Sequence, residues 1–182
     1  RSEIIRTFSS MMEPDVQQGL PGSTHRVYPF NVSLGMGLAS YPLVSTAFLL
    51  LELAGKDIEF KFVSSILRSP FLAGGESEMT NRALLDEQLR KGVEPRITLK
   101  ELFVLIYRKQ NSTNCPILMQ QISSLVEFRK ENLFVRQAPS VLARAISGVL
   151  QIFNFPGERA LDSSEYQTLN KWNEIVAECA AL

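Results

Sequence analysis

Acidic residues are the side chains of this sequence whose spacing first suggests chemistry, because two nearby carboxylates can hold a divalent metal ion for hydrolysis. Three such pairs occur in the 182-residue chain: Glu76 with Glu78, Asp86 with Glu87, and Asp162 with Glu165. Each pair also has a simpler explanation, as a helix cap or as part of a solvated helix face. We therefore predict no catalytic residue and no metal ligand among them.

Residues that commonly act as bases, nucleophiles and soft metal ligands are scarce. The single histidine, His25, stands in a stretch rich in glycine, proline and serine, so a Ser-His-Asp triad or a histidine metal site lacks support. Cys115 and Cys179 are far apart, which argues against a disulfide framework or a zinc site and fits a reducing cytoplasm. We expect no cofactor, and an independent hydrolase is the least favoured function.

Two patterns in the first third of the chain resemble a nucleotide site and a membrane span, but both are incomplete. Gly35-x-Gly37 lacks the third glycine of a dinucleotide fingerprint and follows no convincing buried strand. The apolar run 47–51 is far shorter than the about 20 residues that cross a bilayer, and Glu52 interrupts it. We expect a turn that leads into a buried helix, and no membrane contact.

Basic residues lie near the ends of the expected helices through the middle of the chain: Arg90, Lys91, Arg96, Lys100, Arg108, Lys109, Arg129, Lys130, Arg136 and Arg144. Scattered surface charges that match the helix dipoles account for these positions by themselves. Helix ends that converge would instead bring the cations to phosphates. In that case the expected nucleic-acid contacts are Arg108, Lys109, Arg129, Lys130 and Arg136. Basic and acidic residues number 19 each, so any such surface must be local.

The elements that must position these residues are expected to be helices, because apolar residues recur at helical spacing along most of the chain. With 45% hydrophobic and 21% charged residues, the chain is expected to fold as one domain over 1–182, with an N-terminal helix and loop (1–30) before a helical core (31–182). A short extended segment is expected at 32–38. The pattern predicts an all-α fold of about eight helices. They are expected at 1–13, 42–54, after Asp57 to before Pro70, 76–91, 99–109, from Pro116 through Phe128, 140–153, and after Asp162.

Individual residues specify helix starts and buried faces. Asp57 is a candidate N-cap, and Thr98 with Glu101 and Asp162 with Glu165 have the spacing of a capping box. The inward residues expected in the fourth helix are Met79, Ala83, Leu84 and Leu89. The apolar stripe expected in the last helix consists of Tyr166, Leu169, Trp172, Ile175, Val176 and Cys179.

Several short motifs, taken in order, carry a resemblance to a known family. They are FNVSLG from Phe30, LAxYPLV from Leu38, LRSPFL from Leu67, FPGER from Phe155, and LDSxEYQ from Leu161 with Trp172. Together they resemble the middle of a large family of bacterial probable DNA repair proteins. Those proteins are similar to AddB and RecB, with a helicase-like body followed by a PD-(D/E)XK exonuclease domain. The chain resembles their internal helical segment, which is similar to the 2B insertion subdomain of superfamily 1 helicases.

The resemblance implies a non-catalytic accessory domain of a DNA repair or recombination protein, which handles DNA or packs against neighbouring motor-like and nuclease domains of the same chain. The motor motifs and nuclease carboxylates of the family lie outside this sequence, although the parent protein would be a RecB-like exonuclease. The start at Arg1, without a methionine or signal peptide, agrees with a fragment of a longer cytoplasmic protein. The alternative is a helical protein-protein interaction module without a nucleic-acid role, since the net charge is +0.

Overall fold

The computed structural model describes residues 7, 11–12, 37–92, 94–133 and 138–181. Contacts divide the chain into two units, Arg1–Gly37 and Leu38–Leu182, and nearly all described residues belong to the second. Of the helix expected at 1–13, Thr7, Met11 and Met12 are described, and all three are helical. The loop after it and most of the extended segment expected at 32–38 lie outside the described residues. His25, Gly35 and Arg136 lie outside them as well.

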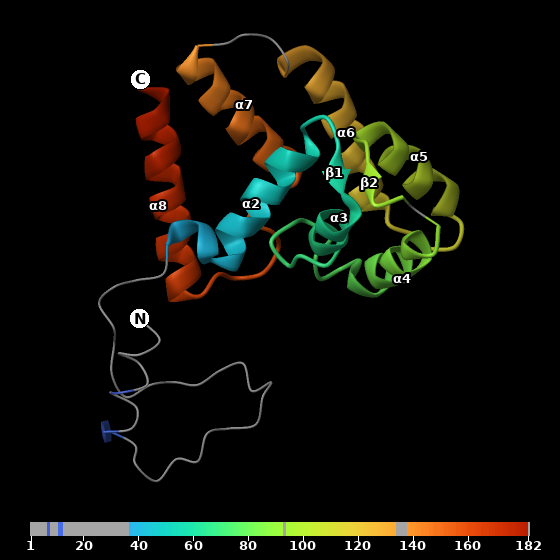
Figure 1. Ribbon diagram of the computed structural model, residues 1–182, viewed down its shortest axis with the longest axis horizontal. Coiled ribbons are helices and arrows are strands. Elements are labelled where there is room, and N and C mark those ends of the chain that lie inside the picture. The colour runs from blue at the N-terminus through green and yellow to red at the C-terminus, as the bar shows by residue number, and fades with distance from the viewer. Residues whose placement is uncertain (1–6, 8–10, 13–36, 93, 134–137, 182) are drawn as a thin grey trace. The chain divides into compact units, whose positions relative to one another are not determined.

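The second unit is built from helices, which confirms the all-α prediction (Figure 1). Its helices are η1 (Leu38–Ser40, a 3-10 helix), α2 (Pro42–Leu53), α3 (Phe60–Leu67), α4 (Met79–Arg90), α5 (Leu99–Lys109), α6 (Pro116–Asn132), α7 (Pro139–Ile152) and α8 (Ser163–Ala180). Two short strands, β1 (Ile58–Glu59) and β2 (Arg96–Ile97), form an antiparallel pair. In the part of the chain that the structure describes, no helix has both the length and the apolar composition to cross a membrane.

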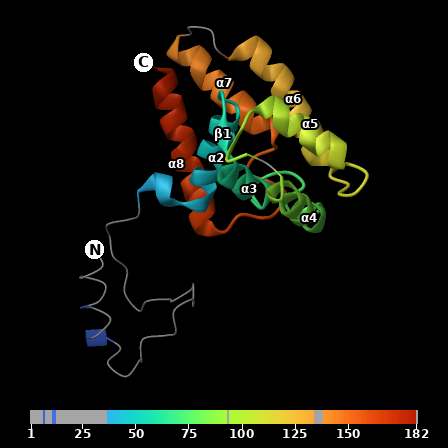
Figure 2. The same ribbon diagram turned by 45° about the vertical axis from the view of Figure 1, so that its right-hand side comes forward.

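Helices that follow one another in sequence pack side by side, and α2 joins the two ends of the series. Contacts run from α3 to α4, from α4 to α5, from α5 to α6, and from α6 to α7. α2 packs against α3 on one side and against α7 and α8 on the other (Figures 1 and 2). This arrangement encloses a single interior between α2 and the other helices.

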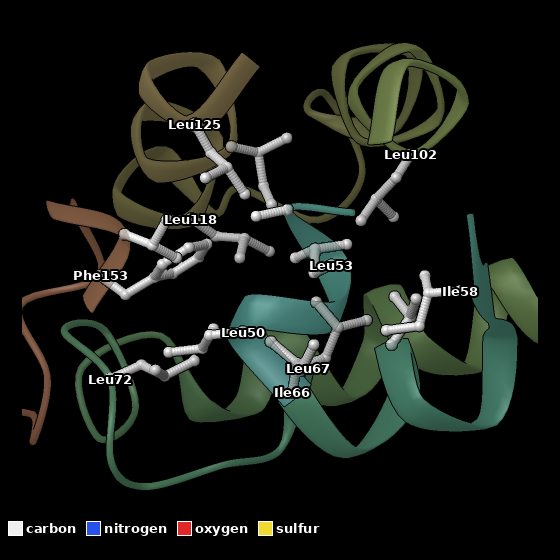
Figure 3. Close-up of a cluster of buried hydrophobic side chains, with 14 of the residues drawn as sticks. Leu50, Leu53, Ile58, Ile66, Leu67, Leu72, Leu102, Leu118, Leu125 and Phe153 are labelled. Carbon is white, nitrogen blue, oxygen red and sulfur yellow. The ribbon is translucent and has the colours of Figure 1, made fainter. Parts of the chain in front are cut away.

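A continuous hydrophobic core fills that interior (Figure 3). Leu50 of α2, Leu118 and Leu125 of α6, and Phe153 after α7 are all completely buried. Burial of apolar surface contributes about 25 cal/mol per Å² and is the main favourable term in folding. Gly148 of α7 lets α6 approach, because a Cβ at this position would lie only 2.6 Å from the ring of Phe128.

Most helix starts follow the local sequence signals. Both predicted capping boxes are confirmed: Thr98 with Glu101 begins α5, and Asp162 with Glu165 begins α8. Proline occupies the first position of α2, α6 and α7, where its missing N–H has no intrahelical acceptor. The bounds of α5 agree with the prediction.

The predicted cap at Asp57 is wrong. Glu59 and not Asp57 precedes the first helical residue, Phe60, because residues 58–59 are held extended by pairing with β2. The N–H of Phe60 donates to the carbonyl of Pro95 at 2.8 Å, which continues this pairing. The carboxylate of Asp57 instead accepts from Nε of Arg96 at 2.5 Å. A contact with a segment distant in sequence therefore replaces the local cap.

The stripe predicted for α8 is only partly buried. Trp172 is buried and packs edge-to-face against Phe48 of α2, with ring centroids 5.3 Å apart. Tyr166, Ile175 and Cys179 are exposed. The prediction overestimated the buried width of this helix, because α8 contacts only α2 and α7 extensively.

Candidate nucleic-acid interface

The inner face of α4 carries charged side chains beside two leucines, which corrects the residues expected there from the sequence. Met79, Ala83 and Leu84 are exposed, and only Leu89 of the predicted set is buried. The buried residues of α4 are Arg82, Leu85, Asp86 and Leu89. The expectation failed for Met79, Ala83 and Leu84 because Arg82 and Asp86, each paired with an oppositely charged residue four positions away, occupy the inner face beside Leu85 and Leu89.

Glu78 and Arg82 form a buried ion pair beneath the loop that precedes α4. Only 5% of Glu78 and 1% of Arg82 are exposed. Nε and Nη2 of Arg82 donate to Oε2 of Glu78 at 3.1 and 3.0 Å, and Nη2 also donates to the carbonyl of Ala73 at 2.7 Å. Gly74 has a φ of 77°, and a Cβ there would collide with the guanidinium group. Glycine is thus required beside this pair.

The same glutamate caps another helix. Its two carboxylate oxygens accept the N–H groups of Ile117 at 2.6 Å and Leu118 at 3.1 Å, in the first turn of α6. The residue at the N-cap position, Cys115, makes no such side-chain bond. Glu78, the residue before α4, therefore supplies the bonds that an Asp or Ser at the N-cap of α6 would supply locally.

Asp86 forms a second cluster, in which two arginines share one buried carboxylate. Oδ2 accepts from Nε and Nη2 of Arg90 at 3.1 and 3.0 Å and lies 3.5 Å from Nε of Arg68. The hydroxyl of Ser64 donates to Oδ1. The carboxylate side chain is 6% exposed, whereas the arginine side chains are 56% and 51% exposed. The charge of Asp86 is thus neutralised from the solvent side.

These contacts correct the interpretation of the carboxylate pairs. Glu78 and Asp86 do not lie on a solvated helix face, because each is buried against arginine. Glu165 does cap α8, and its other contact, with Arg159, holds the pKa of Glu165 below its usual value. Among the described residues, no group of three or more His, Cys, Asp or Glu side chains is placed to hold a metal ion.

Neither cysteine forms a disulfide. Cys115 is buried, and burial raises the pKa of its thiol to about 11, with the nearby charge of Glu78 acting in the same direction. Cys115 is therefore a neutral thiol near neutral pH, which makes it a poor nucleophile.

Basic side chains gather at one surface hollow of about 470 Å³. The cations that line it are Lys56 beyond the end of α2, Lys100 in the first turn of α5, and Arg129 and Lys130 in the last turn of α6. Its other described lining residues are Thr98, Leu99, Val126 and Leu133, so no carboxylate is among them. We call this site the basic hollow.

Local structure accounts for the position of each cation. Gly55, whose N–H donates to the carbonyl of Glu52, turns the chain at the end of α2 and brings Lys56 to the rim. The capping box of Thr98 and Glu101 fixes the first turn of α5 and with it Lys100. This end of a helix also carries partial positive charge from its N–H groups, which adds to the field of the cations.

A neighbouring hollow of about 400 Å³ lies along α5 and carries mixed charge. Its basic residues are Arg96, Lys100 and Arg108, and its acidic residues are Glu94 and Glu101. Arg96 is engaged by Asp57, and the hydrogen bond with that carboxylate raises the pKa of Arg96. Lys100 belongs to both hollows and links them.

The structure brings together part of the predicted set of contacts. Arg129 and Lys130 line the basic hollow, and Arg108 lines the neighbouring one. Lys109 is among the lining residues of neither, and Arg136 lies outside the described residues. Sequence reasoning does not single out Lys56, whose only local signal is its place one residue after a helix-ending glycine.

Compared with known protein families, with curated proteins and with solved structures, the chain has no significant match.

Proposed function

We propose that this chain is a non-catalytic helical module of a DNA repair or recombination protein and that it binds nucleic-acid phosphates through the basic hollow. The observation that carries the proposal is the convergence of Lys56, Lys100, Arg129 and Lys130 on one hollow without a lining carboxylate among the described residues. Lysine and arginine contacts to phosphates supply much of the affinity of nucleic-acid binding. The order of the sequence motifs supports DNA as the polyanion.

The proposed role is to hold or orient DNA beside motor-like and nuclease domains of a parent protein. Pairing of buried Glu78 with Arg82 and of buried Asp86 with Arg90 supports a structural use of the carboxylates that would be the first candidates for catalysis. The two unpaired cysteines support a cytoplasmic location, where thiols stay reduced.

The proposal is tested by reversing charge in the basic hollow with Lys100→Glu/Lys130→Glu. The matched control, Arg144→Glu/Lys171→Glu, changes the net charge equally on α7 and α8. Fluorescence anisotropy with labelled single-stranded, duplex and forked DNA would be measured over a series of salt concentrations. We expect the hollow variant to lose at least about tenfold in affinity, and the slope of log affinity against log salt to fall by about one per cation removed.

Absence of binding by the unaltered chain at low salt would overturn the proposal. An equal loss of affinity in the control would do the same, because it would trace binding to net charge and not to the hollow. Circular dichroism of both variants would establish that they fold.

A helical protein-interaction module without a nucleic-acid role is the second candidate. It is favoured by an apolar hollow of about 250 Å³ between α2, α7 and the residue after α6, lined by Leu51, Ala54, Gly55, Leu133, Leu142, Ala145, Ile146 and Val149. The side chain of Leu142 is 51% exposed. Apolar hollows of this kind receive side chains of partner helices. The DNA titration separates the candidates, because this one predicts no binding to any DNA form.

A further inference from the structure

The outer face of α5 continues the surface of the basic hollow. Lys100, Val104, Tyr107 and Arg108 are spaced so that they share one side of a helix. All four are exposed; 41% of Val104 and 66% of Tyr107 reach solvent. Lys100 lines the basic hollow at one end of this face, and Arg108 lines the neighbouring hollow at the other. Cations thus flank an exposed valine and an exposed tyrosine, and the carboxylates of the neighbouring hollow, Glu94 and Glu101, lie beside Val104.

An aromatic ring on this face is held in a defined orientation. The ring of Tyr107 lies nearly parallel to that of Phe103, with 16° between planes and 6.5 Å between centroids. Phe103 is only partly exposed and packs against the hydrophobic core. Because the inner ring is anchored, the outer ring presents an exposed aromatic surface that is partly oriented before any ligand arrives.

Cations alone would not distinguish a single strand from a duplex, since both present phosphates. Aromatic faces do distinguish them, because the bases of a duplex are stacked on each other and only unpaired bases can stack on a side chain. Alternation of cations and an exposed aromatic is the arrangement by which proteins hold single strands without reading their sequence.

We propose that the outer face of α5 and the basic hollow together form a binding path for single-stranded nucleic acid. Tyr107 stacks on an unpaired base, Val104 contacts the same or the next base, and Lys100 and Arg108 contact the flanking phosphates. This inference rests on the proposed function and adds the class of nucleic acid and the residue that selects it.

The test compares Tyr107→Ala and Tyr107→Phe with Tyr166→Ala as the control. Tyr166 is 59% exposed on α8, which lies across the unit from α5 (Figures 1 and 2). Affinity for an oligothymidine and for a duplex of the same length would be measured by anisotropy at one salt concentration. We expect Tyr107→Ala to weaken single-strand binding about tenfold, in the range of one lost stacking contact. Duplex binding should not change, and Tyr107→Phe should retain the affinity for both.

The possible results separate this inference from the proposed function. Equal effects of Tyr107→Ala on single strand and duplex, or no effect on either, would overturn the single-strand inference while phosphate binding by the hollow stands. Failure of the unaltered chain to bind either oligonucleotide would overturn both. Tyr107→Leu keeps an apolar side chain without a π face, so retention of full single-strand affinity by this variant would also contradict stacking. Thermal unfolding of each variant establishes that it is folded.

Discussion

The inner face of α4 and the basic hollow use the same kinds of side chain in opposite ways. Glu78, directly before α4, and Asp86 within it are buried, and each contacts at least one arginine. In the basic hollow, Lys56, Lys100 and Lys130 are exposed, and the described lining residues include no carboxylate. The carboxylates of the α4 region are neutralised inside the unit, whereas the three lysines of the hollow face solvent. The two regions therefore differ in the burial of their charged side chains and not in the types of residue.

The physical reason for this difference is the cost of desolvation. A buried charge that loses its partner keeps the desolvation penalty without the compensating attraction. An exposed lysine is solvated with or without a partner, so its removal changes stability little. Substitutions in the α4 region should therefore lower the free energy of unfolding more than substitutions in the basic hollow.

The largest effect is expected for Arg82→Met, which keeps side-chain length but leaves Glu78 buried without its cation. The free energy of unfolding should fall by about 3–5 kcal/mol, as when one partner of a buried ion pair is removed. Urea denaturation followed by circular dichroism measures it, with Lys171→Met, which breaks an exposed pair with Glu174, as the control. A loss of less than about 1 kcal/mol would show that the α4 pair resembles a surface pair.

A smaller loss is expected for Asp86→Asn. Arg68 and Arg90 reach solvent, so removing the carboxylate charge leaves no buried cation without a partner. The substitution does weaken the hydrogen bond that the buried Ser64 hydroxyl donates to this side chain. Stability should fall by about 1–3 kcal/mol. Glu87→Gln, one residue along and exposed, is the matched control. If this variant unfolded as readily as Arg82→Met, depth of burial would not be what separates the two clusters.

The next effect depends on pH and concerns the exposed Glu158. Its carboxylate accepts the N–H of Gly74 at 2.6 Å, and this bond holds the pKa of Glu158 below its ordinary 4.5. A carboxyl group with a lowered folded pKa stabilises above its unfolded pKa, and this stabilisation is lost as the pH falls through the folded pKa. Stability measured from pH 6 to about pH 3 should therefore fall less steeply in Glu158→Gln. Glu131→Gln on α6 is the control, and an unchanged slope for Glu158→Gln would contradict the linkage.

The smallest change in stability is expected for Lys100→Glu/Lys130→Glu in the basic hollow. Substitutions of exposed side chains are usually within about 0.5 kcal/mol, and an acidic residue in the first turn of α5 suits the helix dipole. The same urea titration measures this, with Arg144→Glu/Lys171→Glu beside it. A loss as large as that of Asp86→Asn would contradict this expectation, because it would mean that these cations also hold the helices together.

Features that depend on one helical turn were predictable from the sequence. The capping boxes of α5 and α8 agree with the structure because the two residues of each box are three positions apart. The prolines at the starts of α2, α6 and α7 agree because their effect depends on their own backbone. Buried charge was not predictable in this way. Glu78 caps α6 by accepting the N–H of Ile117, 39 positions away, and no local sequence pattern predicts that contact.

The candidate site was predictable only in part, for the same reason. Arg129 and Lys130 could be proposed as a cationic helix end, but their proximity to Lys56 and Lys100 depends on how α2, α5 and α6 pack. Lys109, also at a helix end, shares neither hollow. Position at a helix terminus is thus a weak guide to a surface that several elements form together.

The cap that Glu78 provides to α6 has a consequence for amide hydrogen exchange. First-turn amides of a helix have no intrahelical acceptor and ordinarily exchange quickly with solvent. Those of Ile117 and Leu118 are bound to a buried carboxylate that belongs to the α4 region. Their exchange requires the contact with Glu78 to open, so their protection measures the opening of that contact between distant segments and not the fraying of one helix alone.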